Sequence, residues 1–381
     1  MAHQEDRRTP VLVGHPFAPI GKGEEIRCVF RALRAVDLNP AVYDVYAMNS
    51  RSDPDIVEEI GGKLAHSLSR NVNIFCLNGD EVEPSFNHLG NRLPTSAYNI
   101  ICPHWELSNY PPEWAKQLDR CDEVWAPSRF VFDSLQRAVS KPLLYMSSSV
   151  QVQFASFLGR RYFGLPEGAF IFLFFFDFQS YAGRKNPAAV VEAFEKVCAL
   201  RPRENMCLVI KSHGSESSAQ SNADSQKLLA EISRSRHKSR IIVIDKVFTD
   251  NETKNLMRCC DCFVSLHRSE GFGRGLAEAM FLGKPVVATG YSGNLDFMNE
   301  KNSCLVRYKL VGVGEGRYPH AKGQVWAEPD IGHAVRHMVR LLDDRRYGRK
   351  LGQIASRHIR TYFSYNAIGL RYKKRLDQLL S

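Results

Sequence analysis

The segment Ser265–Asp296 constrains the fold of this chain more than any other stretch. It begins within a short apolar run, Cys262–Leu266, and continues through a glycine-rich turn into a helical pattern that ends at Gly283. Pro285 prevents the helix from continuing, and the apolar residues Val286–Thr289 follow, so the pattern predicts strand, glycine loop, helix and strand. This order of elements is typical of one half of a doubly wound α/β sheet.

The turn in this segment carries residues suited to binding an anion. Gly271, Gly273 and Gly275 let backbone N–H groups approach a ligand, and the following helix adds the positive end of its dipole. Glu270 lies at the carboxyl end of the first strand, where open α/β sheets bind ligands. Glu278 lies well inside the helix, too deep to cap it. Because a carboxylate accepts hydrogen bonds from paired hydroxyls, one glutamate would suit a sugar and the other a ribose.

The two glutamates have the spacing Glu270-x7-Glu278, with Gly271-Phe272-Gly273 between them and Gly283-Lys284-Pro285 after them. This pattern resembles the donor-site signature of retaining GT-B glycosyltransferases of family four. The resemblance implies an α/β fold with two Rossmann-like domains facing each other across a deep cleft, and a C-terminal helix crossing back to the first domain. The alternative is an ordinary strand–helix–strand crossover, whose glycines serve packing and whose glutamates face solvent.

The activity implied by the resemblance is transfer of a sugar from a GDP- or UDP-linked donor to a glycan or lipid-linked acceptor. Surface polysaccharide or glycoconjugate assembly would be the setting. Glu270 would bind hydroxyls of the transferred sugar near its anomeric face, and Glu278 would bind the ribose. No residue is an obvious covalent nucleophile, which favours a front-face reaction in which the departing phosphate takes the acceptor's proton.

The resemblance also assigns the residues that hold the donor diphosphate. Lys185, followed by Asn186-Pro187, matches the family lysine, whereas Gln179-Ser180 stand where many relatives carry an arginine. Arg184 is adjacent to Lys185, and because adjacent side chains diverge, we do not expect both to reach the same phosphate. Ser180 is an alternative hydroxyl donor. The expected donor-binding residues are Gly21, Gly23, Ser180, Arg184, Lys185, Gly271, Phe272, Gly273, Arg274 and Glu278.

The first part of the chain repeats the strand–loop–helix pattern. Pro10–Gly14 predicts a buried strand, and Glu24–Val36 has apolar residues at helical spacing. Gly21 and Gly23 lie between them, and the resemblance places both at the cleft, whereas a plain turn before a helix is the alternative. The glycines do not complete a dinucleotide fingerprint, which argues against an NAD dehydrogenase.

A second specific similarity begins at His104-Trp105-Glu106-Leu107 and continues through Trp114 to Asp122–Ser128 (DEVWAPS). The order of these residues is similar to that in one branch of family four. It implies that His104 and Glu106 lie in the cleft and, with Glu270, are catalytic. A histidine there could bind a sugar hydroxyl or share a proton. The alternative is a satisfied loop histidine beside a core tryptophan.

The chain length of 381 residues indicates two domains of ordinary size. The segment Phe163–Gly168 is rich in glycine and proline and precedes a strong apolar strand, so it is the predicted linker. We therefore expect an acceptor-binding domain over 1–165, a donor-binding domain over 166–360, and a returning helix over 361–381.

The formal charge of +10 and the pI of about 9.1 suit anionic partners such as nucleoside diphosphates or acidic lipids. The basic segment Arg336–Arg375 is either a solvated helix face or a surface that docks on an anionic membrane. No basic patch interleaved with stacking aromatics indicates nucleic acid.

Other composition features argue against a metal site and a membrane span. No histidine stands at zinc-ligand spacing from the cysteines of Cys259–Cys262, and neither a metal nor another cofactor is expected. No apolar run is long enough for a bilayer, and the first ten residues are polar. We expect a cytoplasmic protein, with peripheral contact at the inner face of the membrane as an option.

Two alternatives to a transferase stay open. A hydrolytic nucleotide-sugar epimerase of the same fold would release the nucleoside diphosphate without an acceptor. A non-catalytic protein that binds nucleotide sugar within a larger complex would use the same donor residues.

Overall fold

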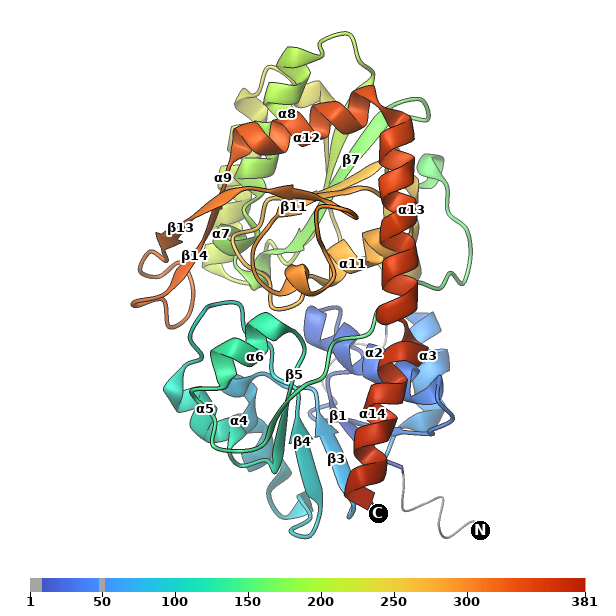
Figure 1. Ribbon diagram of the computed structural model, residues 1–381, viewed down its shortest axis with the longest axis vertical. Coiled ribbons are helices and arrows are strands. Elements are labelled where there is room, and N and C mark those ends of the chain that lie inside the picture. Colours follow the sequence, from blue (N-terminus) through green and yellow to red (C-terminus); the bar gives the residue numbers. More distant parts are fainter. Residues whose placement is uncertain (1–8, 48–51, 381) are drawn as a thin grey trace. The chain divides into compact units, whose positions relative to one another are not determined.

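The computed structural model describes residues 9–47 and 52–380, and the chain divides into two compact units. The first unit comprises Met1–Gln151 and Arg360–Ser381, and the second comprises Val152–Ile359. Each is built around a six-stranded parallel sheet with helices, so the predicted pair of Rossmann-like α/β domains is confirmed (Figure 1).

The first unit has the strand order β2-β1-β3-β4-β5-β6, with every neighbouring pair parallel. All residues of β1, β3 and β5 are buried, as expected for strands covered on both faces. The strands are β1 (Val11–Gly14), β2 (Ala41–Asp44), β3 (Val72–Phe75), β4 (Tyr98–Ile101), β5 (Glu123–Ala126) and β6 (Leu143–Tyr145). The α-helices are α2 (Gly21–Arg34), α3 (Pro54–Ile60), α4 (Gly79–Leu89), α5 (Pro112–Leu118), α6 (Arg129–Leu135) and α14 (Tyr365–Leu380).

The second unit has the order β12-β11-β10-β7-β8-β9, again all parallel, and an additional antiparallel hairpin, β13-β14. The strands are β7 (Phe170–Asp177), β8 (Met206–His213), β9 (Ile241–Asp245), β10 (Cys262–Ser265), β11 (Val286–Thr289), β12 (Cys304–Val306), β13 (Tyr308–Gly312) and β14 (Val325–Pro329). The α-helices are α7 (Ala182–Lys185), α8 (Pro187–Leu200), α9 (Ala219–Arg234), α10 (Asp250–Cys259), α11 (Arg274–Phe281), α12 (Ile331–Asp343) and α13 (Arg345–Tyr362), the last of which runs into the first unit.

The strand orders locate one switch point in each sheet, where the chain changes the direction in which it adds strands. In the first sheet this point lies between β1 and β3, and in the second it lies between β7 and β10. Loops that leave the carboxyl ends of strands at such a point diverge and leave room for a ligand. The switch points are therefore where functional residues are expected in each unit.

The last helix, α14, packs beside α2 in the first unit, as predicted for a returning C-terminal helix (Figure 1). Gly369 allows a close approach, because a Cβ there would lie 2.1 Å from the carbonyl oxygen of Ala32. Tyr372 stacks on the buried Trp125 with ring centroids 5.1 Å apart. The helix is thus part of the first hydrophobic core.

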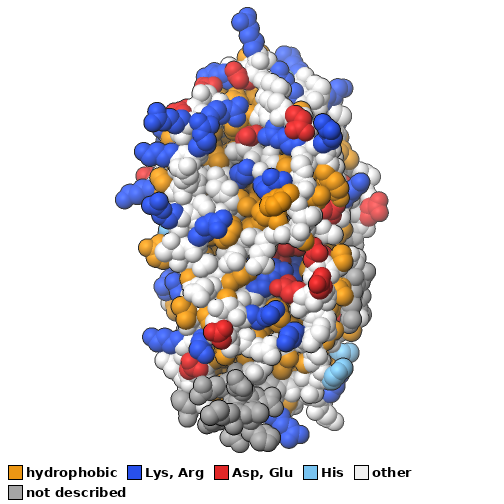
Figure 2. Space-filling view, turned by 90° about the vertical axis from the view of Figure 1, so that its right-hand side faces the viewer, with side chains coloured by type: hydrophobic (Ala, Val, Ile, Leu, Met, Phe, Trp, Pro, Cys, Tyr) orange, Lys and Arg blue, Asp and Glu red, His pale blue; other side chains and the backbone are white. Residues whose placement is uncertain are grey.

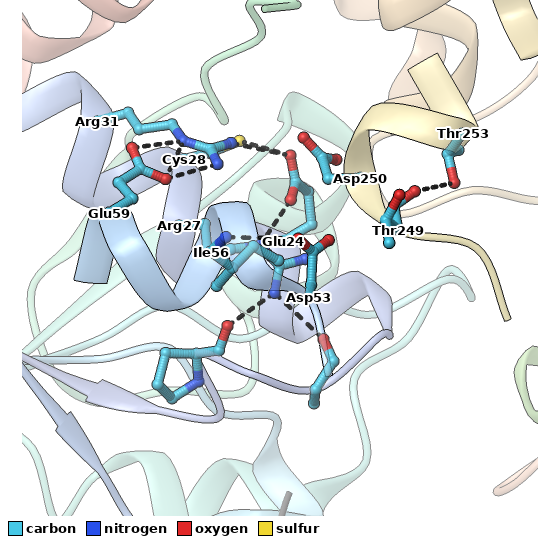
Figure 3. A network of polar contacts seen from close by, with 12 residues as sticks. Glu24, Arg27, Cys28, Arg31, Asp53, Ile56, Glu59, Thr249, Asp250 and Thr253 are labelled. Carbon is cyan, nitrogen blue, oxygen red and sulfur yellow. Dashed lines mark hydrogen bonds and ion pairs between the residues drawn. The ribbon is translucent and has the colours of Figure 1, made fainter. Parts of the chain in front are cut away.

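A network of buried and partly buried charges fixes α2 (Figure 3). Arg27 donates to Glu24 at 2.8 Å and to the carbonyl oxygen of Pro16 at 2.7 Å. Arg31 binds the carboxylate of Glu59, on α3, through two nitrogens, the shorter contact being 2.7 Å. These contacts hold the loop after β1, which carries part of the first switch point.

The division between the units lies at Gln151–Val152 rather than after residue 165. Residues 152–165 belong to the second unit because their backbone is bound to α10. Asn251 accepts hydrogen bonds from the backbone N–H groups of Ala155 and Ser156, and Asn255 accepts one from Leu158. The glycine–proline segment Phe163–Gly168 is a turn within the second unit rather than the linker.

Candidate functional site

The switch point of the second unit is formed by the loops that follow β7 and β10. After β7 the chain makes a 3-10 turn, Phe178–Ser180, and then the short helix α7. Tyr181 and Asn186 bracket α7 with φ angles of 64° and 58°, which are uncommon for residues other than glycine. The Asn186 amide donates to the carbonyl oxygen of Leu266 at 3.0 Å, so the two loops are tied together.

Arg184 and Lys185 converge on Glu270, contrary to the prediction that their side chains diverge. The Lys185 ammonium lies 2.5 Å from one carboxylate oxygen of Glu270 and the Arg184 guanidinium lies 3.3 Å from the other. Arg184 also donates to the carbonyl oxygen of Ser269 at 2.9 Å. The reason is length: two long side chains from one turn can reach the two oxygens of the same carboxylate. Both cations can therefore contact the same ligand.

The charge on Glu270 is set by these neighbours. Burial disfavours its ionised form, but the positive charges of Lys185 and Arg184 outweigh burial and lower the pKa of Glu270 to about 2. Glu270 is therefore a carboxylate at any physiological pH. It can accept hydrogen bonds from hydroxyl groups but has no proton to donate.

The loop between Glu270 and α11 packs closely against the loop that follows β11. A Cβ on Gly293 would lie 2.1 Å from the carbonyl oxygen of Gly271, so only glycine fits where the two loops meet. Gly273, with a φ of 93°, precedes Arg274 at the start of α11. The predicted glycine turn and helix end, with Gly283 in the left-handed region, are therefore observed.

Phe272 differs from the other predicted donor residues. Its side chain is buried and packs on Phe297 with ring centroids 5.1 Å apart. The side chain is thus part of the core, and only the backbone of Phe272 is left for a ligand. At Phe272, the prediction of donor binding therefore applies only to the backbone N–H group.

Glu278 is buried on α11 and forms a very short ion pair with Lys254. Lys254, on α10, also lies 3.4 Å from Asp250. Neither Glu278 nor Glu270 faces solvent, so the interpretation of the segment as a crossover with solvated glutamates is wrong. Lys254 was missed in the sequence because its spacing from Glu278 matches no motif.

Two further polar groups stand at the carboxyl ends of neighbouring strands. Lys211, at the end of β8, is buried, and burial lowers its pKa to about 8. Its ammonium lies 5.4 Å from the ring centroid of Phe248. Ser180 ends the turn after β7, and its hydroxyl makes no hydrogen bond to any residue within 9–47 and 52–380.

The switch point of the first unit gathers a second polar cluster. His15, after β1, lies 3.0 Å from Glu81 at the start of α4, and Lys22 donates to the carbonyl oxygen of Cys102 at 2.7 Å. Gly21 and Gly23 form the first turn of α2 rather than a loop before it. A Cβ on Gly23 would lie 2.1 Å from the carbonyl oxygen of Ala18, so Gly23 serves close packing.

His104 and Glu106 follow β4 on the same side of this sheet. The His104 backbone N–H donates to Asn78 at 3.1 Å, and its ring Nε2 lies 3.7 Å from a carboxylate oxygen of Glu25. Glu25 is buried and accepts hydrogen bonds of 2.9 and 3.0 Å from the Ser148 hydroxyl. Sequence reasoning missed Glu25 and Ser148, which only the fold brings to His104.

Trp105 is a core residue, as the alternative interpretation held. Its indole N–H donates to the carbonyl oxygen of Asn109 at 2.8 Å, and its ring packs edge-on against Trp114 at 5.3 Å. Glu106 is partly buried beside it. Trp105 therefore anchors the loop that carries His104 and Glu106.

Within the described ranges 9–47 and 52–380, no group of three or more His, Cys, Asp or Glu residues is arranged to hold a metal ion. In the same part of the chain, no helix is both long and apolar enough to cross a membrane.

Residues 170–327 match the family model described as "Glycosyl transferases group 1". A search of curated proteins finds no match. Solved structures do match. Anabaena HepE, in complex with UDP and glucose, has 12% identity and a TM-score of 0.66 over 97% of this chain and 100% of its own. Thermosynechococcus elongatus sucrose-phosphate synthase has 14% identity and a TM-score of 0.70 over 97% and 99%.

A structure of trehalose-6-phosphate synthase, described as catalysing glycosyltransfer with retention, has 11% identity and a TM-score of 0.64 over 97% of this chain and 99% of its own. At such identities, the likeness of these three structures shows the fold. The two Rossmann-like units therefore have the GT-B fold expected from the sequence.

Proposed function

We propose that this protein is a retaining glycosyltransferase that uses a nucleoside-diphosphate sugar. The observation that carries the proposal is the convergence of Lys185 and Arg184 on Glu270 at the switch point of the second sheet. Two cations and one carboxylate suit the two ends of such a donor, because the diphosphate needs positive charge and the sugar needs hydroxyl acceptors. The family match over residues 170–327 supports the same interpretation.

The diphosphate would bind Lys185, Arg184 and the backbone N–H groups of residues 271–274. As the bond to the sugar breaks, negative charge grows on the departing phosphate, and these groups stabilise it. They supply the positive charge that a metal ion supplies in other transferases, so we propose that the reaction is metal-independent. Glu278 would bind the ribose hydroxyls, with its ion pair to Lys254 orienting the carboxylate.

Glu270 would bind hydroxyls of the transferred sugar close to the anomeric carbon. Because the pKa of Glu270 is about 2, it can stabilise positive charge that develops on the sugar but cannot act as a general acid. We propose a front-face reaction in which the departing phosphate takes the proton of the acceptor hydroxyl. Retention of configuration then needs no covalent intermediate on the protein.

The first unit would bind the acceptor through the cluster at its own switch point. His104, with Glu25 behind it and Glu106 beside it, offers hydrogen-bonding groups for sugar hydroxyls. His15 and Glu81 lie at the neighbouring strand end. We propose that this cluster, rather than the donor site, selects the acceptor.

A lipid-linked acceptor would place the protein at an anionic membrane surface. On α13 the basic side chains Arg345, Arg346, Arg349, Lys350 and Arg357 are all exposed. Figure 2 shows a face of the second unit on which lysine and arginine outnumber acidic side chains. We propose that this face makes peripheral contact with the cytoplasmic side of a membrane, where glycan precursors would be assembled.

The test is to incubate the protein with UDP- or GDP-sugars, with and without total lipid-linked glycan acceptors, and to measure nucleoside diphosphate and glycan product. Transfer that requires acceptor and retains anomeric configuration supports the proposal. Release of nucleoside diphosphate at the same rate without acceptor would instead favour the hydrolytic epimerase. Tight donor binding with neither product would favour the non-catalytic binding partner.

A further inference from the structure

The second unit contains a cavity of about 360 Å³ that is separate from the donor residues. It lies between α9, the start of α8 and the hairpin β13-β14. Ala182 and Gly183, on α7, line the cavity, whereas the next two residues, Arg184 and Lys185, contact Glu270. Its volume falls within the range of about 300–1,000 Å³ that is usual for small-molecule sites.

One face of α9 supplies charged groups to this cavity. Asp224, Lys227 and Glu231 line it and are spaced three and four residues apart, which places them on one side of the helix. These three side chains form no hydrogen bond or ion pair with any residue of the described ranges 9–47 and 52–380. Arg317, from the hairpin loop, lines the cavity opposite them.

The wall opposite α9 is held rigidly by Arg268. Its guanidinium donates to both carboxylate oxygens of Glu328, at 2.6 and 3.1 Å, and to the carbonyl oxygen of Gly183 at 2.5 Å. It also lies 5.3 Å from the ring centroid of Trp326. The hairpin and α7 are therefore tied to each other on this side of the cavity.

The charges of the lining determine which ligand fits. Three cations (Lys227, Arg268 and Arg317) are balanced by three carboxylates (Asp224, Glu231 and Glu328). An anion would meet the carboxylates of α9, and a cation would meet Arg317 and Lys227. An uncharged ligand with many hydroxyls can use both signs, because carboxylates accept and cations donate hydrogen bonds. Trp326, Leu228 and Val311 add apolar surface for the C–H face of a sugar ring.

We propose that this cavity is a binding site for an uncharged saccharide unit, distinct from the donor site. The proposal does not depend on catalysis, since it concerns binding to groups that lie outside the donor and acceptor clusters. For a protein that acts on glycans, such a site would hold a sugar residue of a longer chain.

Saturation-transfer NMR on the full chain tests the proposal. The probes are maltose, cellobiose, lactose and diacetylchitobiose as uncharged disaccharides, and glucose phosphate as the charged counterpart. We expect at least one uncharged disaccharide to bind, and its affinity to fall about tenfold in Asp224→Ala and in Glu231→Ala, because each removes a charged hydrogen-bond acceptor. Gln226→Ala, an exposed substitution on α9 outside the cavity, is the matched control and should bind as the wild type does.

Lys185→Ala distinguishes this cavity from the donor site, and it should leave disaccharide binding unchanged. A melting temperature like that of the wild type shows that each variant is folded. The proposal is overturned if no uncharged disaccharide binds, if only glucose phosphate binds, or if binding depends on Lys185 but not on Asp224 and Glu231. Loss of nucleotide binding alone would count against the proposed transferase and not against this cavity.

Discussion

At the scale of single residues, the central feature is a carboxylate held by two cations from adjacent positions. Glu270 fixes the ends of Lys185 and Arg184, and they keep it ionised. A donor diphosphate would share the cations while the carboxylate turns to sugar hydroxyls. The two cations and the carboxylate are nevertheless already charged and close together before substrate arrives, and fixed charges of this kind favour electrostatic stabilisation of a transition state.

Glu270→Gln should lower the rate of sugar transfer about 10- to 100-fold, because it replaces a charged hydrogen-bond acceptor by a neutral amide. The measurement is initial-rate transfer from the preferred nucleotide sugar. Glu192→Gln, in an exposed ion pair with Lys196 on α8, is the control and should keep the wild-type rate. A Glu270→Gln enzyme with unchanged rate contradicts the role given to this carboxylate.

Lys185→Met should destabilise the fold in a manner that depends on pH. The pKa of Glu270 in the folded protein is about 2, below its ordinary value of 4.5, so its ion pairs stabilise the fold above pH 4.5 and are lost as pH falls towards 2. The difference in unfolding free energy between wild type and variant should be about 3 kcal/mol at pH 7 and should shrink in acid. Urea unfolding at several pH values measures it, and a difference independent of pH would refute the coupling.

At the residue level, the sequence indicates single candidate residues through motifs but not the pairs that these residues form. The glutamates and Lys185 were found because their spacing resembles a known signature. Arg184 is among the residues expected to bind the donor, but the sequence gives no sign that it shares a partner with Lys185, since the rule that adjacent side chains diverge ignores the reach of long side chains. Lys254 and Glu25 were not found because their partners, Glu278 and His104, come from other elements.

At the scale of elements, two loops meet so closely that their contact determines the shape of the proposed donor site. The backbone N–H of Glu270 donates to the Ser292 hydroxyl at 2.8 Å, and the N–H of Gly293 donates to the carbonyl oxygen of Glu270 at 3.0 Å. These bonds hold the loop that precedes α11. The backbone N–H groups of this loop stay in place only if the loop that carries Ser292 and Gly293 packs against it.

Gly293→Ala should disrupt this contact, because its Cβ would lie 2.1 Å from the carbonyl oxygen of Gly271. We expect a loss of about 1–3 kcal/mol in unfolding free energy and weaker binding of nucleoside diphosphate. Gly312→Ala is the control, since no atom lies within 4 Å of its added Cβ. Calorimetric unfolding and nucleotide titration of both variants test this, and equal behaviour of the two would contradict it.

The element order was predictable where hydrophobic periodicity and breakers agreed, as for the strand–helix–strand segment ending at Gly283. The start of the second unit was not. Phe163–Gly168 has the composition of a linker, yet Arg160 nearby binds Asp261 at 2.8 Å and the carbonyl oxygen of Cys259 at 3.1 Å. The glycine and proline content of a segment indicates local flexibility, but it does not indicate which residues the segment contacts in the folded protein.

At the scale of the whole molecule, each unit carries its own switch point and its own polar cluster. The first gathers histidines and carboxylates, and the second gathers cations around Glu270. This difference in chemistry supports a division of labour in which one unit binds acceptor and the other binds donor. The two-domain fold followed from length and repeated strand–loop–helix patterns, whereas no motif records the side-chain geometry that would select an acceptor and a sugar.

The excess of positive charge leads to a prediction for the whole molecule. The protein should bind vesicles that contain phosphatidylglycerol and should be released as salt rises, because the attraction is screened. Replacing Arg345, Arg346 and Arg349 by glutamate should abolish binding, whereas the same change at the partly exposed Arg201, which is paired with Asp343, should have little effect. Vesicle sedimentation measures this, and binding that persists in the triple variant would show that α13 is not the docking surface.

The most direct test of the central claim is isothermal titration of the full chain with UDP, GDP and their common sugar conjugates. The account predicts saturable binding of at least one of them, lost in Lys185→Ala and retained in Lys196→Ala, an exposed lysine on α8 of the same unit. Binding that is unchanged in Lys185→Ala, or no binding of any conjugate by the folded protein, would contradict the assignment of a nucleotide-sugar site to Lys185, Arg184 and Glu270.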